Sequence, residues 1–377
     1  MPLRAVAEVN LAAIERNAER LRRRLHAHTR LCAVVKADAY GHGAAPAARA
    51  ALAGGASMLA VATASEAAGL REAGLQAPIL VLGALSPEEL DVALAAAAEI
   101  TAWEPGFVRS VAARAASAPA PIGVHVKLDT GLGRLGTRDV EQALDTVRAV
   151  LAAGPRLRLA GVMTHLATAD GDLDFAAAQL RRFGPFVAES RALATTEITV
   201  HAANSAALLR LPDSHFDMVR AGLALYGGDP LHHDPADHGL EPALALRSYV
   251  AALKPITAGQ SVGYGRRFIA AGDGLIATLP IGYADGVPRA LADNCEVLIG
   301  GRRMPLRGMV SMDNITVEVG SDDQVTVGQR ATLIGTDGDE RQTVEELAGR
   351  VGTISYELLC WISRRVPRQY HRDGAPA

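Results

Sequence analysis

The chain has 377 residues, of which 49% are hydrophobic and 21% charged, and its formal net charge is −3. This length suits two domains, and the composition is typical of a protein with a sizeable core. The weak negative charge excludes the basic surface that nucleic-acid binding requires, and no stretch approaches the roughly 20 apolar residues that span a bilayer. We therefore expect neither a nucleic acid nor a membrane as a partner.

The N-terminal segment lacks the apolar core of a signal peptide, which predicts a cytoplasmic protein. The three cysteines of the chain, Cys32, Cys295 and Cys360, lie far apart and form no CxxC pair. This spacing supports neither a disulfide framework nor a zinc site.

From the N-terminus to about residue 230, short apolar runs alternate with amphipathic helical stretches. Helices are expected, for example, over Ala44–Ala53, Ser65–Ala73, Pro87–Ala97 and Phe175–Leu193. Eight strand-and-helix units predict the α/β class and a (β/α)₈ barrel over residues 1–235, with a doubly wound sheet as the alternative. The expected strands are Cys32–Lys36, Met58–Ala62, Ile79–Leu82, Glu99–Ala102, Gly123–Leu128, Leu159–Thr164, Thr199–Ala202 and Asp217–Ala221.

The pattern changes after the linker Gly227–Leu240, and residues 236–377 are expected to form a mostly β domain. Helices are expected at its end, over Thr343–Arg350 and Ser355–Ile362, and Thr343 and Glu346 have the spacing of a capping box. The linker histidines have no fixed ligand scaffold, so no metal is expected there. The expected strands are Leu246–Ala252, Gly274–Leu279, Glu296–Ile299, Asn314–Val319 and Arg330–Ile334.

The first chemical cluster, Val34–Gly43, ends an apolar strand with Lys36 and continues as Ala-Asp-Ala-Tyr-Gly-His-Gly. A lysine at this position points out of the carboxyl mouth of a barrel, where barrel active sites lie. Partial burial lowers the pKa of such an amine and favours Schiff-base chemistry. An isolated lysine at a strand end is usually only solvated, but the two glycines around His42 suggest a loop shaped around a ligand.

This decapeptide resembles the cofactor-attachment motif of the bacterial alanine racemase family, and the resemblance continues along nearly the whole chain. It implies that Lys36 carries pyridoxal 5'-phosphate (PLP) as a Schiff base and that Tyr40 contacts the phosphate.

Further residues of the resemblance follow later barrel strands. Arg134, in the glycine-rich segment Lys127–Gly136, would contact the cofactor and the substrate carboxylate. Lys127 matches a position that is often a carbamylated lysine, although an ordinary buried ion pair is the alternative. The resemblance places His165 against the pyridine ring and Ser205 on the phosphate.

The eighth strand and the loop after it complete the barrel part of the expected site. Backbone N–H groups of Gly222 and Leu223 are expected on the phosphate, as in other barrels. Arg220 matches the residue that faces the pyridine nitrogen, where many PLP enzymes place a carboxylate. Because arginine does not give up its proton, the ring would withdraw electrons weakly, which suits racemisation better than decarboxylation.

The second domain adds four residues by resemblance. Tyr264 would be a second base donated across a dimer interface, and Tyr283 would line the entrance. The backbone of Met312 would meet the substrate carboxylate, and Tyr356 would close over the phosphate. Ser311 stands where many relatives carry cysteine, which affects no expected catalytic role.

The resemblance implies a homodimeric isomerase that interconverts L-alanine and D-alanine by a two-base mechanism, with Lys36 and Tyr264 as the bases. The resemblance implies a supply of D-alanine for peptidoglycan precursors, with a catabolic role as the alternative. A serine or broad-specificity racemase and a related barrel decarboxylase are the enzyme alternatives. A non-catalytic PLP carrier is the alternative from another class, but it would not need the additional domain.

Overall fold

The computed structural model describes residues 3–115, 120–320 and 324–377. The chain folds as two compact units. The barrel unit comprises Ile14–Ala39 and Gly43–Leu225, and the β unit comprises Met1–Ala13, Tyr40–His42 and Tyr226–Ala377. None of the helices in the described ranges has both the length and the apolar character needed to cross a bilayer.

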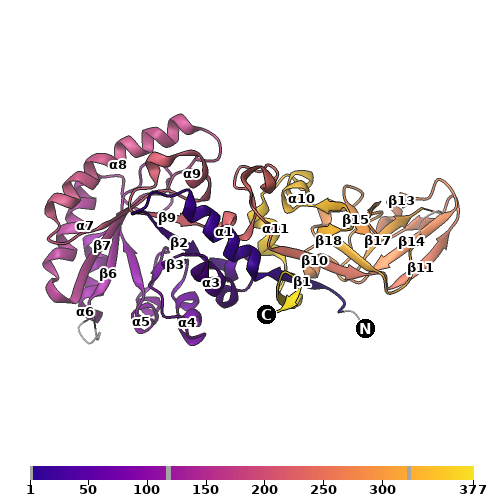
Figure 1. Cartoon of the computed structure of the whole chain (residues 1–377), viewed down its shortest axis with the longest axis horizontal. Coiled ribbons are helices and arrows are strands. Elements are labelled where there is room, and N and C mark those ends of the chain that lie inside the picture. Colours follow the sequence, from indigo (N-terminus) through magenta and orange to yellow (C-terminus); the bar gives the residue numbers. More distant parts are fainter. Residues whose placement is uncertain (1–2, 116–119, 321–323) are drawn as a thin grey trace. The chain divides into compact units, whose positions relative to one another are not determined.

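Eight parallel strands form the core of the barrel unit (Figure 1). Their carbonyl and amide groups pair in the order β8-β7-β6-β5-β4-β3-β2-β9. Backbone hydrogen bonds from Asp217 to Val200 and from Arg220 to Ala203, both 3.0 Å, join the two ends. The expected barrel is confirmed. The strands are β2 (Arg30–Val34), β3 (Met58–Val61), β4 (Ile79–Val81), β5 (Glu99–Ala102), β6 (Ile122–Lys127), β7 (Leu157–Met163), β8 (Thr199–His201) and β9 (Met218–Ala221).

Helices follow the strands and lie around them, as Figure 1 shows for α3 to α8. Helices α4 and α5 have capped starts: the Thr63 and Ser86 side chains each form a reciprocal capping box with a glutamate three residues later. The helices are α1 (Leu11–Arg23), α3 (Ala44–Ala53), α4 (Ala64–Glu72), α5 (Pro87–Ala95), α6 (Pro105–Arg114), α7 (Val140–Ala152), α8 (Leu173–Leu193) and α9 (Ser205–Arg210).

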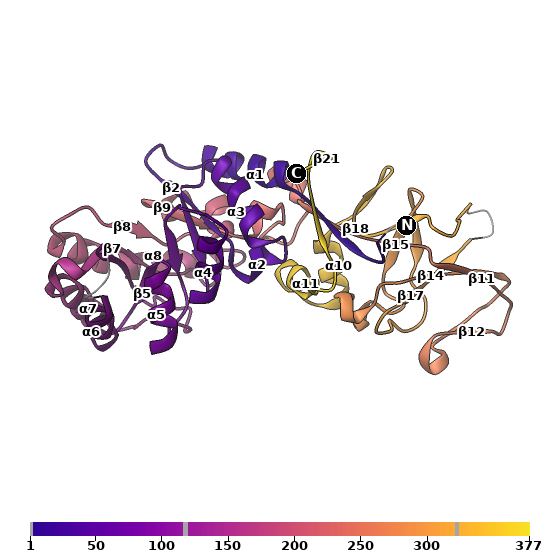
Figure 2. The ribbon, with the colours of Figure 1, turned by 90° about the horizontal axis from the view of Figure 1, so that it is seen from below.

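The β unit contains one large sheet and two smaller ones (Figure 2). The large sheet has the order β16 (Arg302–Pro305), β15 (Glu296–Ile299), β18 (Arg330–Asp337), β10 (Leu244–Tyr249), β1 (Val6–Asn10), β20 (Arg368–Arg372) and β21 (Ala375–Pro376), with β19 (Glu340–Gln342) paired to β18. The smaller sheets are β11 (Ala252–Ile256), β14 (Gly274–Leu279) and β17 (Ile315–Val319), and the hairpin of β12 (Ser261–Val262) and β13 (Phe268–Ile269).

The N-terminal strand β1 is part of the large sheet of the β unit. The sequence pattern did not predict this strand. It pairs antiparallel to β10 and parallel to β20. The two expected C-terminal helices are present as α10 (Val344–Val351) and α11 (Ser355–Trp361). Thr343 caps α10 by accepting the Glu346 N–H, but the Glu346 carboxylate bonds to Arg303 and Arg350, so the capping box is only half formed.

Candidate active site

Polar side chains from several strands converge at the carboxyl end of the barrel. Lys36 lies two residues beyond β2, Lys127 ends β6, and Arg220 is the penultimate residue of β9. His165 follows β7, and the charges of Arg220, Lys127, Arg134 and Lys36 all contribute to lowering its pKa. The barrel unit therefore brings together the cations that the sequence placed at its mouth.

Directly after Lys36 the backbone makes one left-handed turn (α2, Lys36–Tyr40). Ala37, Asp38 and Ala39 have φ between 51° and 55°, a conformation that costs L-residues about 1–2 kcal/mol each. Hydrogen bonds hold the turn: Glu66 accepts the Ala37 N–H at 2.6 Å, and Asp38 accepts the Ala44 N–H at 2.7 Å. Such strain is typical of functional sites, because the surrounding structure must enforce it.

Arg220 is buried, and its hydrogen-bond partners are all uncharged acceptors. Its Nη1 donates to His201 Nδ1 at 2.7 Å, and its Nη2 lies within 3.0 Å of the Thr164 and Ala202 carbonyls and His165 Nδ1. Among the described residues no carboxylate contacts it directly. Burial lowers its pKa to about 10, so the guanidinium remains charged at neutral pH.

The electrostatic surroundings keep His165 neutral. Burial, followed by the charge of Arg220, lowers its pKa well below the ordinary value. Lys127 is buried as well, and burial together with Arg220 and Arg134 lowers its pKa to about 8. A mouth with several cations and a neutral imidazole is suited to a planar, multiply anionic ligand.

Asp129 organises the loop that carries Arg134, and the sequence interpretation missed it. Its carboxylate accepts backbone N–H groups of Gly131, Leu132 and Gly133, and Arg138 Nε lies 3.0 Å from it. These hydrogen bonds hold the pKa of Asp129 below its usual value despite burial. An aspartate directly before a glycine-rich segment was the available signal, since Asp side chains commonly accept N–H groups of the turn that follows.

Ser205 begins α9 and is buried close to the end of β9. Its Oγ accepts the N–H of Gly222 at 2.9 Å and that of Ala224 at 3.4 Å. The structure therefore brings Ser205 together with the loop that includes Gly222 and Leu223. The Gly222 N–H is directed at the serine hydroxyl, which leaves that hydroxyl its own proton to donate.

Within the β unit, Tyr40 packs against two other tyrosines. Its ring centroid lies 5.1 Å from that of Tyr226 and 5.9 Å from that of Tyr356. Burial and the neighbouring Tyr356 raise the pKa of Tyr40, so its phenol stays protonated and can donate a hydrogen bond. This cluster joins two of the tyrosines that the sequence assigned to phosphate binding.

Three further predicted residues are exposed on the β unit. Tyr283 and Met312 lie on adjacent segments, because the Tyr283 N–H donates to the Ser311 carbonyl and the Ala284 N–H to the Met312 carbonyl. Tyr264 begins the turn between β12 and β13, which projects from the unit in Figure 2, and 75% of its surface is exposed. In the single chain Tyr264 is thus a solvent-facing phenol.

The segment around Tyr283 is fixed by a buried carboxylate, Asp285, that the sequence did not single out. Asp285 accepts hydrogen bonds from Arg4 at 2.7 and 2.9 Å, and Arg365 Nε lies 2.9 Å away. It also accepts the Gly282 N–H at 2.8 Å. These contacts hold the backbone that carries Tyr283 in one conformation.

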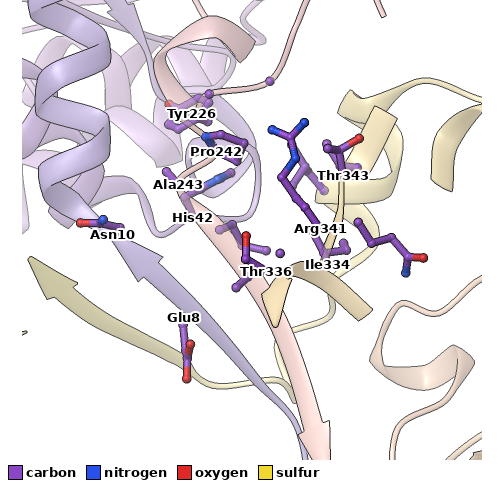
Figure 3. A pocket seen from close by; sticks show the side chains of 18 of the residues that line it. Glu8, Asn10, His42, Tyr226, Pro242, Ala243, Ile334, Thr336, Arg341 and Thr343 are labelled. Atoms are coloured by element: carbon purple, nitrogen blue, oxygen red, sulfur yellow. The ribbon is translucent and has the colours of Figure 1, made fainter. Parts of the chain in front are cut away.

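A pocket of about 280 Å³ lies in the β unit and is shown in Figure 3. Its lining includes His42, Tyr226 and Thr336, but none of the residues predicted for the site. The two arginines that line it are already paired, Arg247 with Glu8 and Arg341 with Asp234. The arginines of this pocket are therefore neutralised by carboxylates, whereas the hydrogen bonds of Arg220 at the barrel mouth go to neutral groups.

Comparison with known proteins agrees with this arrangement. Residues 9–230 match the family described as "Alanine racemase, N-terminal domain", and residues 243–370 match "Alanine racemase, C-terminal domain". The chain belongs to the alanine racemase family. The family assignment predicted from the sequence is thereby confirmed.

Individual members of the alanine racemase family are similar over nearly their whole length. An alanine racemase of Nostoc sp. is 42% identical over 97% of this chain and 95% of its own. Alanine racemase 1 of Bacillus subtilis is 41% identical over 98% and 93%. The solved alanine racemase of Streptomyces coelicolor A3(2) superposes with a TM-score of 0.92 at 38% identity, covering 97% of each chain.

A solved structure with a ligand belongs to the same group. It is the alanine racemase of Bacillus anthracis with bound L-Ala-P, which has a TM-score of 0.91 and 36% identity and covers 100% of this chain and 97% of that one. Both units of the chain therefore have the fold of known alanine racemases.

Proposed function

We propose that this chain interconverts L-alanine and D-alanine with PLP as its cofactor. The observation that carries the proposal is the placement of Lys36, Lys127 and Arg220 at the carboxyl ends of barrel strands, with Arg220 Nη2 3.0 Å from His165 Nδ1. When bound, PLP withdraws electrons from the amino acid and makes its α-proton removable.

The residues present fit this cofactor. Arg134 would be the cation for its phenolic oxygen and for a substrate carboxylate. The Ser205 hydroxyl and the protonated Tyr40 would donate hydrogen bonds to the phosphate, and Tyr356 packs against Tyr40. Lys36 would hold PLP covalently, with His165 beside the pyridine ring and Arg220 at its nitrogen. Gly222 and Leu223 would complete the phosphate site.

The chain's own groups would move the proton. The Lys36 amine would exchange the α-proton of D-alanine, and the phenol of Tyr264 of the partner subunit would exchange that of L-alanine. Arg134 and the Met312 backbone would orient the substrate carboxylate, and Tyr283 would line the entrance. Tyrosine's ordinary pKa near 10 is high for a base, so a neighbouring cation must stabilise its phenolate.

A homodimer is part of the proposal because Tyr264 is exposed in the single chain. The domain predicted over residues 1–235, which contains the barrel unit, would bind the cofactor, and residues 236–377 would complete the site of the other subunit. A cytoplasmic location and a role in peptidoglycan synthesis remain predictions from the sequence.

Mixing two inactive variants tests the shared site. Lys36→Ala and Tyr264→Phe should each lose at least about a hundredfold in rate, as expected for a missing acid–base group. After unfolding and refolding them together in equal amounts, about a quarter of wild-type activity should return, because half the dimers pair the two variants and contain one intact site.

The refolding control is each variant treated alone, which should remain inactive. If the mixture also stays inactive although wild-type enzyme refolds with full activity, the two residues do not act across subunits.

Serine as the substrate provides the test of specificity, because a serine racemase would convert it faster than alanine.

A further inference from the structure

A chain of hydrogen bonds crosses the barrel interior from Arg220 to Glu99. Arg220 Nη1 lies 2.7 Å from His201 Nδ1, and His201 Nε2 lies 2.8 Å from His125 Nδ1. His125 Nε2 lies 2.7 Å from Glu99 Oε2. The second oxygen of Glu99 accepts Arg158 Nη2 at 2.7 Å, at the outer surface of the barrel.

The chemistry of the two ends fixes the direction of every hydrogen bond in this chain. Arginine can only donate, so His201 Nδ1 must accept, and the proton of this imidazole lies on Nε2. His125 must then accept at Nδ1 and donate from Nε2. A carboxylate can only accept, so Glu99 is the matching end.

The charges agree with that direction. Burial, followed by the charge of Arg220, lowers the pKa of His201 well below its ordinary value, which keeps the ring neutral. Burial raises the pKa of Glu99, but the hydrogen bond from His125 and the charge of Arg158 bring it below its ordinary value. The chain therefore connects a buried cation to a carboxylate through two neutral imidazoles.

The barrel strands are shaped around these polar groups. A Cβ at Gly161 would lie 2.7 Å from His125 Nδ1, and a Cβ at Gly123 would lie 2.8 Å from the Glu99 carboxyl carbon. Glycine weakens a strand interior and commonly marks a close approach. The pairing of β6 with β7 also shifts register between Val124 and His125, and such irregularities redirect side chains.

We propose that Glu99, His125 and His201 are positioning residues that hold the Arg220 guanidinium in place for the pyridine nitrogen of PLP. The inference rests on the proposed function. A carboxylate behind an imidazole increases electron density on the far nitrogen, as carboxylate–histidine pairs do for metals. Hydrogen bonds in a chain also polarise one another in a low dielectric. Glu99 thus strengthens the hydrogen bond that His201 accepts from Arg220, although Glu99 does not touch Arg220.

The first test uses the holoenzyme and the variant Glu99→Gln, which keeps the size and an acceptor oxygen but removes the charge. We expect kcat for alanine to fall about tenfold or more with little change in KM, and the visible absorption band of bound PLP to shift. Glu99→Asp keeps the carboxylate charge, so its kcat should lie between that of Glu99→Gln and that of the wild type. Asp217→Asn is the matched control, because Asp217 is a half-buried barrel carboxylate bound to Arg191 and to the Val200 N–H.

Histidine labelled with ¹⁵N provides a readout that does not depend on activity. In the wild type both His125 and His201 should be neutral with the proton on Nε2. Glu99→Gln should shift the signals of both rings, whereas Asp217→Asn should shift neither. A charged ring, or the opposite tautomer at either histidine in the wild type, would overturn the inference.

The two proposals fail in different ways. A wild-type holoenzyme that does not racemise alanine contradicts the proposed function. A wild type that racemises alanine, alongside a Glu99→Gln variant with unchanged rate and unchanged PLP spectrum, contradicts the positioning role alone.

Discussion

Cationic side chains around His165 determine what the barrel mouth can bind. Lys127 and Arg220 are almost fully buried, and the hydrogen bonds of Arg220 go to neutral groups. Burying charges without a direct counter-ion is costly, so such an arrangement is retained where an anion completes it. At the scale of single residues, the site is organised for a ligand with several negative groups.

The formation of a carbamate on Lys127 can be measured directly. With a pKa of about 8, its amine gains a large neutral fraction between pH 7 and pH 8. Only a neutral amine adds carbon dioxide to form a carbamate and release a proton. At constant dissolved carbon dioxide, the rate of ¹³C-carbamate formation, measured by ¹³C NMR, should rise about fivefold over this interval.

The small number of lysines makes this measurement specific. The sequence contains three, Lys36, Lys127 and Lys254. Lys127→Met should abolish the carbamate signal and Lys254→Gln should preserve it. A signal that survives Lys127→Met would contradict the assignment.

The sequence could predict those residues of the candidate site that follow strand ends. Lys36, Lys127 and Arg220 were found in this way, because a barrel collects the ends of its strands at one mouth. Glu99 and His125 lie within or at the start of strands and resemble ordinary polar residues. Their contact depends on the register of β5, β6 and β8, which one sequence does not specify.

At the scale of elements, strands buried on both faces were the easiest to predict. Such strands are continuous apolar runs, and the expected Met58–Ala62 and Ile79–Leu82 agree with β3 and β4 to within one residue. Strand β1 was not predicted because it is short and its partner β10 begins at Leu244, far along the chain. The left-handed turn after Lys36 was not predicted either, because alanine and aspartate rarely adopt that conformation.

Glycines inside elements are expected to differ sharply in their response to substitution. In Gly161→Ala the new Cβ would lie 2.3 Å from the Thr199 carbonyl oxygen as well as close to His125, so β7 and β8 must shift. Urea unfolding should show a loss of about 1–3 kcal/mol in the free energy of unfolding.

Gly69→Ala is the matched control, because Gly69 lies in helix α4 with no atom within 4 Å of the new Cβ. It should stabilise the protein by about 0.5–1 kcal/mol. Equal changes in the free energy of unfolding for the two substitutions would mean that an added Cβ at Gly161 does not disturb the strands.

At the scale of the whole molecule, buried histidines should make stability depend on pH. Burial lowers the pKa values of His165 and His201, and in the unfolded chain these groups titrate near 6.5. The unfolded state therefore binds more protons as the pH falls below 6.5, and stability is lost in that direction. Proton binding by His201 in the unfolded chain should by itself lower the free energy of unfolding by up to about 1.4 kcal/mol per pH unit.

The melting temperature should accordingly fall between pH 7 and pH 5, with or without PLP. Glu99 and Asp129 do not account for this interval, since their pKa values are held below the ordinary carboxyl range and they titrate at lower pH. A melting temperature that is constant or rises over this range would show that the histidines are charged in the folded protein.

Racemisation in deuterated water is the decisive test of the proposed activity. Purified protein with PLP is given L-alanine in D₂O, and D-alanine is measured with a stereospecific oxidase while NMR follows deuterium at the α-carbon. The account predicts D-alanine that carries deuterium, the reverse reaction from D-alanine, and at least about a hundredfold loss of both with Lys36→Ala. Absence of D-alanine from the wild type, or undiminished conversion by Lys36→Ala, would contradict it.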